Sequence, residues 1–178
     1  VAALRRRFPG VESRETAAED LPWADETFDS ALAQLVVSFM NDAPAGVREM
    51  HRVVRRGGTV AVCMWDIERM EMLAAVDRTR DALGHPREAG RYRTRAEIEE
   101  LMGPDAEIEL LEVEGLYSDF EDFWAALAGG AGPAGAWAAS LDDDDREVAR
   151  AELYRQLGEP EGPFGLTGRA WAARVRRG

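Results

Sequence analysis

The chain has 178 residues, of which 46% are hydrophobic and 31% charged, and its 34 acidic against 22 basic side chains give a formal net charge of −12. This length and composition predict one globular domain with a single core. The negative charge disfavours phosphate backbones and anionic lipid headgroups, so we expect neither nucleic acid nor a membrane surface as a partner. Cys63 is the single cysteine, which excludes an internal disulfide and indicates a buried, reduced thiol.

The pattern of apolar residues bears on the cellular location. No apolar run reaches the roughly 20 residues that span a bilayer. The arginines at 5–7 are not followed by the apolar segment of a signal peptide. We therefore expect a cytoplasmic protein.

The first predicted elements are a helix and a short strand. Val1, Leu4 and Phe8 lie on one helical face, and Pro9 follows them, which predicts the end of a helix whose beginning is absent. VESRET, at 11–16, is expected to be a short strand. An acidic loop then leads to residue 28.

Residues 28–66 predict a strand, a helix and a second strand. FDSALAQLVVSFM (28–40) has an unbroken apolar centre, typical of a parallel strand covered on both faces. Asp42 is the expected N-cap of the helix, RRGG (55–58) is expected to end it, and TVAVCMWD (59–66) is the second strand. Such a unit has parallel strands, and ligands bind at their carboxyl ends. The functional face is therefore expected at 34–38 and 65–66.

The second half predicts more helices than strands. The expected helices cover 68–83, 94–102, 120–127 and 141–158, and the expected strands cover 106–117 and 164–175. Ser118 and Glu121 fit a capping box, and the acidic run 142–145 suits a helix N-terminus. GGAGPAG, at 129–135, has the composition of a flexible loop.

Several short motifs resemble one known family. They are E-D-L-P-W at 19–23, F-D at 28–29, R-E-M-H-R-V at 48–53, R-G-G at 56–58, W-A-A-L at 124–127, G-P-A-G at 132–135 and R-A-W-A-A-R at 169–174. Together they resemble the class I S-adenosylmethionine-dependent methyltransferases of the type 11 group. The resemblance implies an α/β fold with a Rossmann-like, doubly wound mixed sheet of seven strands, in which the last strand is antiparallel and lies between the fifth and sixth.

On that template, the third to seventh strands are 11–16, 29–36, 59–65, 107–117 and 164–175. The glycine-rich cofactor loop and the first two strands of the family would precede residue 1. We therefore expect a single truncated methyltransferase domain, with residues 1–66 as its cofactor-side core and 67–178 as its substrate-side half. The fourth strand is then an unusual sheet edge. Either the chain is a fragment, or a homodimer or strand exchange covers that edge.

The resemblance also implies cofactor-binding residues for S-adenosyl-L-methionine. Ala17, Ala18 and Glu19 match the loop that contacts adenine, although Ala17 lacks the acidic or amide side chain that family members often carry there. Gln34 and Leu35 match the strand end that faces the methionine part, largely through a backbone carbonyl. The competing interpretation is a polar surface loop and a glutamine that ends a strand.

The candidate substrate contacts are Ser38, Trp65, Asp66 and Trp124, the last together with the glycine-rich loop as a lid. Asp66 could act as a general base, although alignment of donor and acceptor supplies most of the rate in methyl transfer. The competing interpretations are a turn residue, core aromatics, a helix cap and a hinge. We predict no specific catalytic residue and no metal site, and we interpret both histidines as structural or exposed.

Three functions are compatible with these features. The first is methyl transfer from S-adenosylmethionine to a small-molecule acceptor, in an N-terminally incomplete form. The second is a cofactor-deficient relative that acts as an interaction or scaffolding module. The third is a dinucleotide enzyme, whose glycine fingerprint the chain does not contain.

Overall fold

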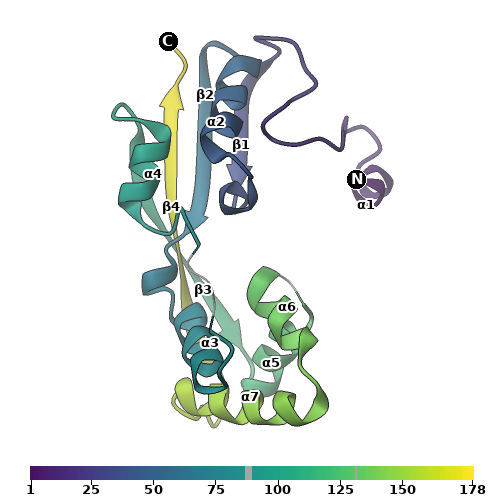
Figure 1. Cartoon of the computed structure of the whole chain (residues 1–178), viewed down its shortest axis with the longest axis vertical. Helices are drawn as coiled ribbons and strands as arrows, with labels where there is room; N and C mark the ends of the chain where they lie inside the picture. The colour runs from purple at the N-terminus through teal and green to yellow at the C-terminus, as the bar shows by residue number, and fades with distance from the viewer. Residues whose placement is uncertain (87–89, 131) are drawn as a thin grey trace. The chain divides into compact units, whose positions relative to one another are not determined.

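The computed structural model describes residues 1–86, 90–130 and 132–178. Its sheet has four strands in the order β1 (Phe28–Gln34), β2 (Val54–Trp65), β4 (Phe164–Arg176) and β3 (Glu107–Tyr117) (Figure 1). The last strand in the sequence thus lies between β2 and β3, as the family resemblance predicts.

The strand directions make the sheet mixed. β1 and β2 are parallel, and Gln34 is paired with Cys63 at the end of their register. β4 is antiparallel to β2, because residues further along β2 pair with residues further back along β4. Gly57 donates its N–H to the carbonyl of Arg177 at 2.8 Å, and Asp66 donates to the carbonyl of Arg169 at 2.9 Å. The predicted antiparallel last strand is confirmed.

The described residues form two compact units. The first comprises Val1–Met64, Ala96–Ile108 and Ala172–Gly178, and the second comprises Trp65–Arg95 and Glu109–Trp171. The single domain predicted from the sequence, divided near residue 66, stays a prediction.

The first unit is built on the predicted strand, helix and strand. Helix α2 (Ala43–Val53) begins where expected, because the Asp42 carboxylate accepts from Ala45 N at 2.9 Å. Its apolar face contacts β1 and contributes to a core made of Val47, Met50, Val53, Val60, Val62 and Met64. Helix α4 (Arg95–Met102), in which Arg95 falls in the second unit, buries Ile98 and Met102.

The glycines at 57 and 58 lie within β2, so the prediction that RRGG ends the helix is wrong. Helix α2 ends at Val53, and the pairing of β1 with β2 shifts register between Phe28 and Ser30. Gly57 has a φ of +75°, and a Cβ on Gly58 would lie 2.5 Å from the carbonyl oxygen of Asp29. The two glycines therefore permit a bulge that joins α2 to the sheet.

The segment 11–16 is not a strand, which corrects the predicted third strand. Its residues have no regular structure, and the carbonyl of Ser13 accepts from the Arg5 guanidinium at 2.7 Å. A strand needs a neighbour to satisfy its backbone groups, and none of the four described strands pairs with this segment. The preceding helix α1 (Ala2–Arg7) buries none of its residues.

β1 is an edge strand, as predicted, because it pairs with β2 alone among the described strands. The expectation that both its faces are covered is wrong: Leu32 is 78% exposed, and Ala33 is the one buried residue of the strand. The strand also ends at Gln34, earlier than the predicted 36, and a short 3₁₀ turn, η1 (Val37–Phe39), follows it.

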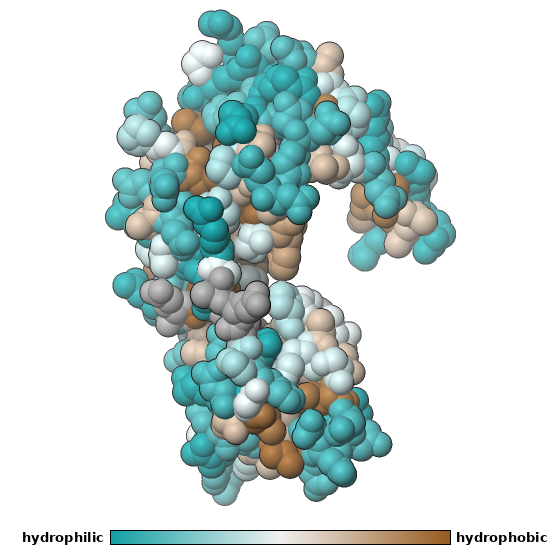
Figure 2. Space-filling view, in the orientation of Figure 1, coloured by the Kyte–Doolittle hydropathy of each residue, from teal (hydrophilic) through white to brown (hydrophobic). Residues whose placement is uncertain are grey.

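The second unit is mainly helical, with α3 (Glu71–Ala82), α5 (Phe120–Ala128), α6 (Gly132–Ser140) and α7 (Asp143–Gln156) (Figure 1). Helix α3 packs against α7 and α5 packs against α6. Their shared core contains Val76, Phe120, Phe123, Trp124, Leu127, Trp137, Leu141 and Leu153. On the face drawn in Figure 2, hydrophilic residues predominate and hydrophobic residues show in separate patches.

The structure of the second unit tests three predictions: the starts of two helices and the flexible loop at 129–135. Asp142 caps α7 by accepting from Asp145 N at 2.9 Å, which confirms the role of the acidic run. Helix α5 is capped by Asp119 and not by Ser118, a shift of one residue. The predicted flexible loop 129–135 is corrected in part, because α6 already begins at Gly132; residue 131 lies outside the described residues.

Within the described ranges, no helix combines the length and the apolar character that crossing a membrane requires.

Candidate functional site

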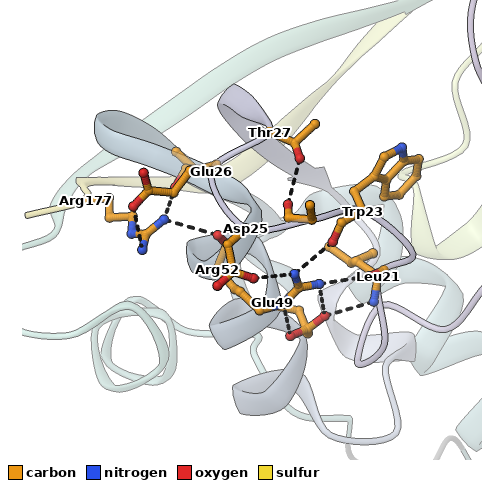
Figure 3. A network of polar contacts seen from close by, with 10 residues as sticks. Leu21, Trp23, Asp25, Glu26, Thr27, Glu49, Arg52 and Arg177 are labelled. Atoms are coloured by element: carbon orange, nitrogen blue, oxygen red, sulfur yellow. Dashed lines mark hydrogen bonds and ion pairs between the residues drawn. The ribbon is translucent and has the colours of Figure 1, made fainter.

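The acidic loop before β1 is attached to helix α2 through both backbone groups of Leu21. Leu21 N donates to Glu49 Oε2 at 2.9 Å, and Leu21 O accepts from the Arg52 guanidinium at 2.8 Å (Figure 3). Glu49 and Arg52 lie one turn apart on α2 and are joined by two hydrogen bonds, of 2.7 and 2.8 Å. We call this arrangement, formed by Leu21, Glu49 and Arg52, the Leu21 clip.

The Arg52 guanidinium also holds the next residues of the loop. It donates to the carbonyl of Trp23 and to the carboxylate of Asp25, both at 2.8 Å. The backbone carbonyl of Arg52 accepts from Glu26 N at 3.0 Å, and Arg177, which follows β4, donates to the same carbonyl at 3.1 Å (Figure 3). Residues 21–26 therefore follow a course fixed by one arginine on α2.

The charges of the clip reinforce one another. The hydrogen bonds from Arg52, and then the one from Leu21 N, lower the pKa of Glu49 to about 2. The same pairing raises the pKa of Arg52. Both side chains are therefore ionised at neutral pH, which makes their hydrogen bonds to the loop charge-assisted.

Ala17, Ala18 and Glu19 form the turn that precedes the clip. Ala17 is exposed, and its carbonyl accepts from Asp20 N at 3.3 Å. Glu19 accepts from Asp42 N at 2.9 Å, which lowers its pKa. The structure thus uses the Glu19 carboxylate to hold the loop against the start of α2. Of the three predicted cofactor contacts, Ala17 presents only backbone groups and a methyl.

Gln34 and Leu35 lie where β1 ends. Gln34 is exposed, and Leu35 N donates to the carbonyl of Cys63 at 2.7 Å. Leu35 has a φ of +58°, in the left-handed region that side chains with a Cβ rarely adopt. Such strain costs about 1–3 kcal/mol and is concentrated at functional sites. Glu26, Tyr92 and Glu159 share this conformation, so it is the position of Leu35 at the end of a parallel strand that makes it a candidate site.

Ser38 lies just beyond this strand end. It is an exposed residue of η1, between the buried Val37 and the exposed Phe39. Because its neighbour Val37 fixes the turn in the core, Ser38 has a defined position close in sequence to Leu35. Its contact with a substrate stays a prediction.

Trp65 is the last residue of β2, Asp66 follows it, and both lie in the second unit. Asp66 is 3% exposed, and its Oδ2 has no hydrogen-bond partner among the described residues. Its side chain does not cap the following 3₁₀ turn, η2 (Ile67–Arg69), so the helix-cap interpretation is wrong. A buried carboxylate oxygen without a donor is costly, and such groups are concentrated at sites where a ligand or a proton supplies the partner.

Trp124 lies in the apolar core of the second unit and is 8% exposed. Packing alone accounts for this tryptophan, and its predicted role at a lid stays a prediction. The two histidines also have ordinary surroundings. Burial and the nearby Arg177 lower the pKa of His51, and His85 accepts from the Trp137 indole at 3.5 Å. The described ranges contain no cluster of three residues suited to a metal ion.

Sequence reasoning missed the Leu21 clip, although it used the same residues. Glu49 and Arg52 are part of the R-E-M-H-R-V motif, and their i, i+3 spacing indicated a helical ion pair. Nothing in that spacing showed that the pair would bind a backbone segment almost thirty residues earlier in the sequence.

Known proteins are similar in sequence to the first segment of the first unit. Residues 1–62 match the methyltransferase domain family. Over 70 residues, the chain is 36% identical to demethylmenaquinone methyltransferase from Chlorobaculum parvum and 37% identical to phosphatidylethanolamine N-methyltransferase from Cereibacter sphaeroides. These matches cover 39% of this chain and 27% and 34% of the two relatives, so the chain spans about a third or less of their length.

Solved structures extend the likeness to most of the chain. A proposed type II methyltransferase from Anaeromyxobacter dehalogenans has a TM-score of 0.56 and 25% identity, over 89% of this chain and 68% of that one. A proposed methyltransferase from an antibiotic biosynthesis pathway of Anabaena variabilis has a TM-score of 0.54 and 18% identity, over 96% and 78%. Residues 1–62 are therefore similar in sequence to the methyltransferase domain family, and most of the chain has a fold similar to that of proposed methyltransferases.

Proposed function

We propose that this chain supplies one wall of the cofactor site and the acceptor side of an S-adenosylmethionine-dependent methyltransferase that acts on a small molecule. The observation that carries the proposal is the bend of the chain at Gln34 and Leu35, in which Leu35 has a left-handed backbone. It lies at the carboxyl end of a parallel strand, where α/β folds bind ligands, and within the residues that match the methyltransferase domain.

The groups at this strand end suit the methionine part of the cofactor. An ammonium needs acceptors, and Gln34 offers its exposed side-chain amide oxygen and its backbone carbonyl. The turn at Ala17 and Ala18, which Glu19 and the Leu21 clip hold in place, offers backbone groups to the edge of an adenine ring. When bound, the cofactor would supply a methyl group on a positively charged sulfur.

In the second unit, Asp66 is a candidate general base. Its unpartnered, buried Oδ2 can take a proton from an acceptor hydroxyl or amine. An acceptor with a free lone pair does not need this step, because alignment of the reacting groups then supplies most of the rate. The named relatives act on a demethylmenaquinone and on phosphatidylethanolamine, so a carbon or nitrogen acceptor is compatible with this assignment.

Calorimetric titration with S-adenosylhomocysteine, the demethylated cofactor, tests the proposal. We expect weak binding, because the described residues of 1–62 supply one wall of the site. Gln34→Lys should lower the affinity about tenfold by placing a cation beside the ligand ammonium. Leu32→Lys is the matched control, since Leu32 is an exposed residue of the same strand. Binding that Gln34→Lys leaves unchanged, or no binding at all, would contradict the proposal.

A second candidate function is an interaction module without methyl transfer. The observation that favours it is the open edge of β1, beside which Leu32 and Phe39 are 78% and 65% exposed. Such an edge accepts a strand from another copy of the chain. Sedimentation equilibrium distinguishes the two candidates: a dimer that dissociates in Leu32→Lys and binds no S-adenosylhomocysteine would favour the module.

A further inference from the structure

The second unit contains a cavity of about 470 Å³ that is widely open to solvent and that none of the predicted site residues lines. One wall is a face of α3, formed by Glu71, Ala74 and Arg78, which are spaced one helical turn apart. Arg69 of η2 also lines the cavity. The remaining lining comes from Gln156 and Leu157 at the end of α7 and from Phe164, Gly165 and Leu166 at the start of β4. This volume lies in the range of small-molecule sites, roughly 300–1,000 Å³.

The charged part of the lining is cationic, in a chain whose formal net charge is −12. Arg78 donates from Nε to the Gln156 side chain at 2.7 Å, which orients the guanidinium and leaves its terminal nitrogens available. The Arg69 guanidinium has no acceptor among the described residues. Glu71 is the one acidic side chain of the lining, and its Oε2 accepts from Thr167 N at 3.4 Å.

The apolar part of the lining packs on the hydrophobic core of the second unit. The Phe164 ring packs against Tyr117 and Phe123, with ring centroids 5.4 and 6.1 Å apart. Leu157 and Leu166 pack on the same core. Two guanidinium groups thus lie around a fixed apolar surface, a combination that suits a ligand with an anionic head and a hydrocarbon body.

We propose that this cavity binds a small amphiphilic carboxylate. The carboxylate lies between Arg69 and Arg78, and the hydrocarbon body lies against Phe164 and Leu166. This inference does not depend on the proposed methyl transfer, because it concerns a binding site that lies wholly within the second unit.

Titration with octanoate, followed by calorimetry and by the amide resonances of Gly165 and Leu166, tests the inference. We expect saturable binding that shifts both resonances. Arg69→Gln and Arg78→Gln should each weaken it about tenfold, the effect of losing one charge-assisted contact. Both arginines are exposed, so the fold should survive, and circular dichroism checks this.

Three comparisons separate this site from nonspecific binding. Glu71→Gln should strengthen octanoate binding a few-fold, because it removes the acidic side chain from the lining. Arg48→Gln, at an exposed arginine of α2 in the first unit, should leave it unchanged. Acetate and octyltrimethylammonium should bind far more weakly than octanoate. Octanoate binding that is absent, insensitive to both arginine variants, or matched by octyltrimethylammonium would overturn the inference.

Discussion

Glu49 and Arg52 lie one turn apart on α2 and are joined by two hydrogen bonds, of 2.7 and 2.8 Å. Both side chains also bind the backbone of one residue of the preceding loop, Leu21. The carboxylate accepts from Leu21 N and the guanidinium donates to Leu21 O. The pair therefore does for this loop what a neighbouring strand does for an edge, since it satisfies a backbone donor and a backbone acceptor at once.

Arg52→Gln should release the loop without unfolding α2. The glutamine cannot reach the carbonyls of Leu21 and Trp23 together with Asp25, so the protection of the Leu21 amide against hydrogen exchange should fall about tenfold. Exchange measured by NMR checks this. Arg48→Gln on the same helix is the control, and equal losses in both variants would show that the clip does not hold the loop.

The clip should also respond to pH in one direction. Arg52 lowers the pKa of Glu49 to about 2 from its ordinary 4.5, so the stabilisation is present above pH 4.5 and is lost as the pH falls towards 2. The stability difference between wild type and Glu49→Gln should therefore shrink over that window in urea unfolding.

A matched control for the contact between Glu49 and Leu21 lies on α7. Glu152 has the same i, i+3 relation to Arg155, which likewise lowers its pKa to about 2, but its hydrogen bonds stay within that helix. We expect the Leu21 amide resonance to shift in Glu49→Gln and to stay in place in Glu152→Gln. A shift in both variants would contradict a local clip.

Gly58→Ala should disrupt the junction between α2 and β2. The added Cβ would lie 2.5 Å from both Asp29 O and Val54 Cγ1, so we expect a loss of about 2–3 kcal/mol in the free energy of unfolding. At Gly57 the cost is the left-handed φ alone, about 1 kcal/mol. Urea denaturation of both variants checks the order, and a more harmful Gly57→Ala would show that contact with β1 is not the reason for glycine at 58.

The strain at Leu35 can be measured by substitution. Leu35→Asn should cost little or add about 1 kcal/mol of stability, because asparagine tolerates the left-handed region. Leu35→Val should be the less stable of the two, since a β-branched side chain tolerates it least. Equal stabilities in thermal unfolding would mean that the backbone at 35 carries no strain.

Asp66→Asn should raise stability by about 1 kcal/mol, because it replaces a buried carboxylate whose Oδ2 has no hydrogen-bond partner among the described residues. Asp142→Asn is the control, since asparagine caps a helix as well as aspartate and should change little. Thermal unfolding of both variants measures the two stability changes. A destabilised Asp66→Asn would show that this carboxylate already has a partner.

The sequence predicted the elements whose signals are local. The N-cap Asp42 located the start of α2, and the strand expected at 106–117 agrees with β3. The strand order came from the family resemblance. The prediction of a strand at 11–16 was wrong. The composition of the segment suits a strand, but a strand also needs a pairing partner, which local sequence does not reveal.

The candidate site was predictable in its location and not in its details. The carboxyl end of β1 followed from the strand–helix–strand pattern, which placed Gln34 and Leu35 there. The left-handed φ of Leu35 and the unpartnered Oδ2 of Asp66 were not predictable, because both depend on tertiary packing. Sequence rules fail in this way where structure is strained.

The Leu21 clip has a consequence for how this loop can vary. Because it binds the backbone of residue 21, the identity of that side chain matters little to the anchor. The course of residues 21–26 is encoded in Glu49 and Arg52 instead. Substitutions at Leu21 and Trp23, which are bound through their backbone, can therefore change what the loop presents to a ligand without changing its path. One change on α2 would instead release the path of an unchanged loop sequence.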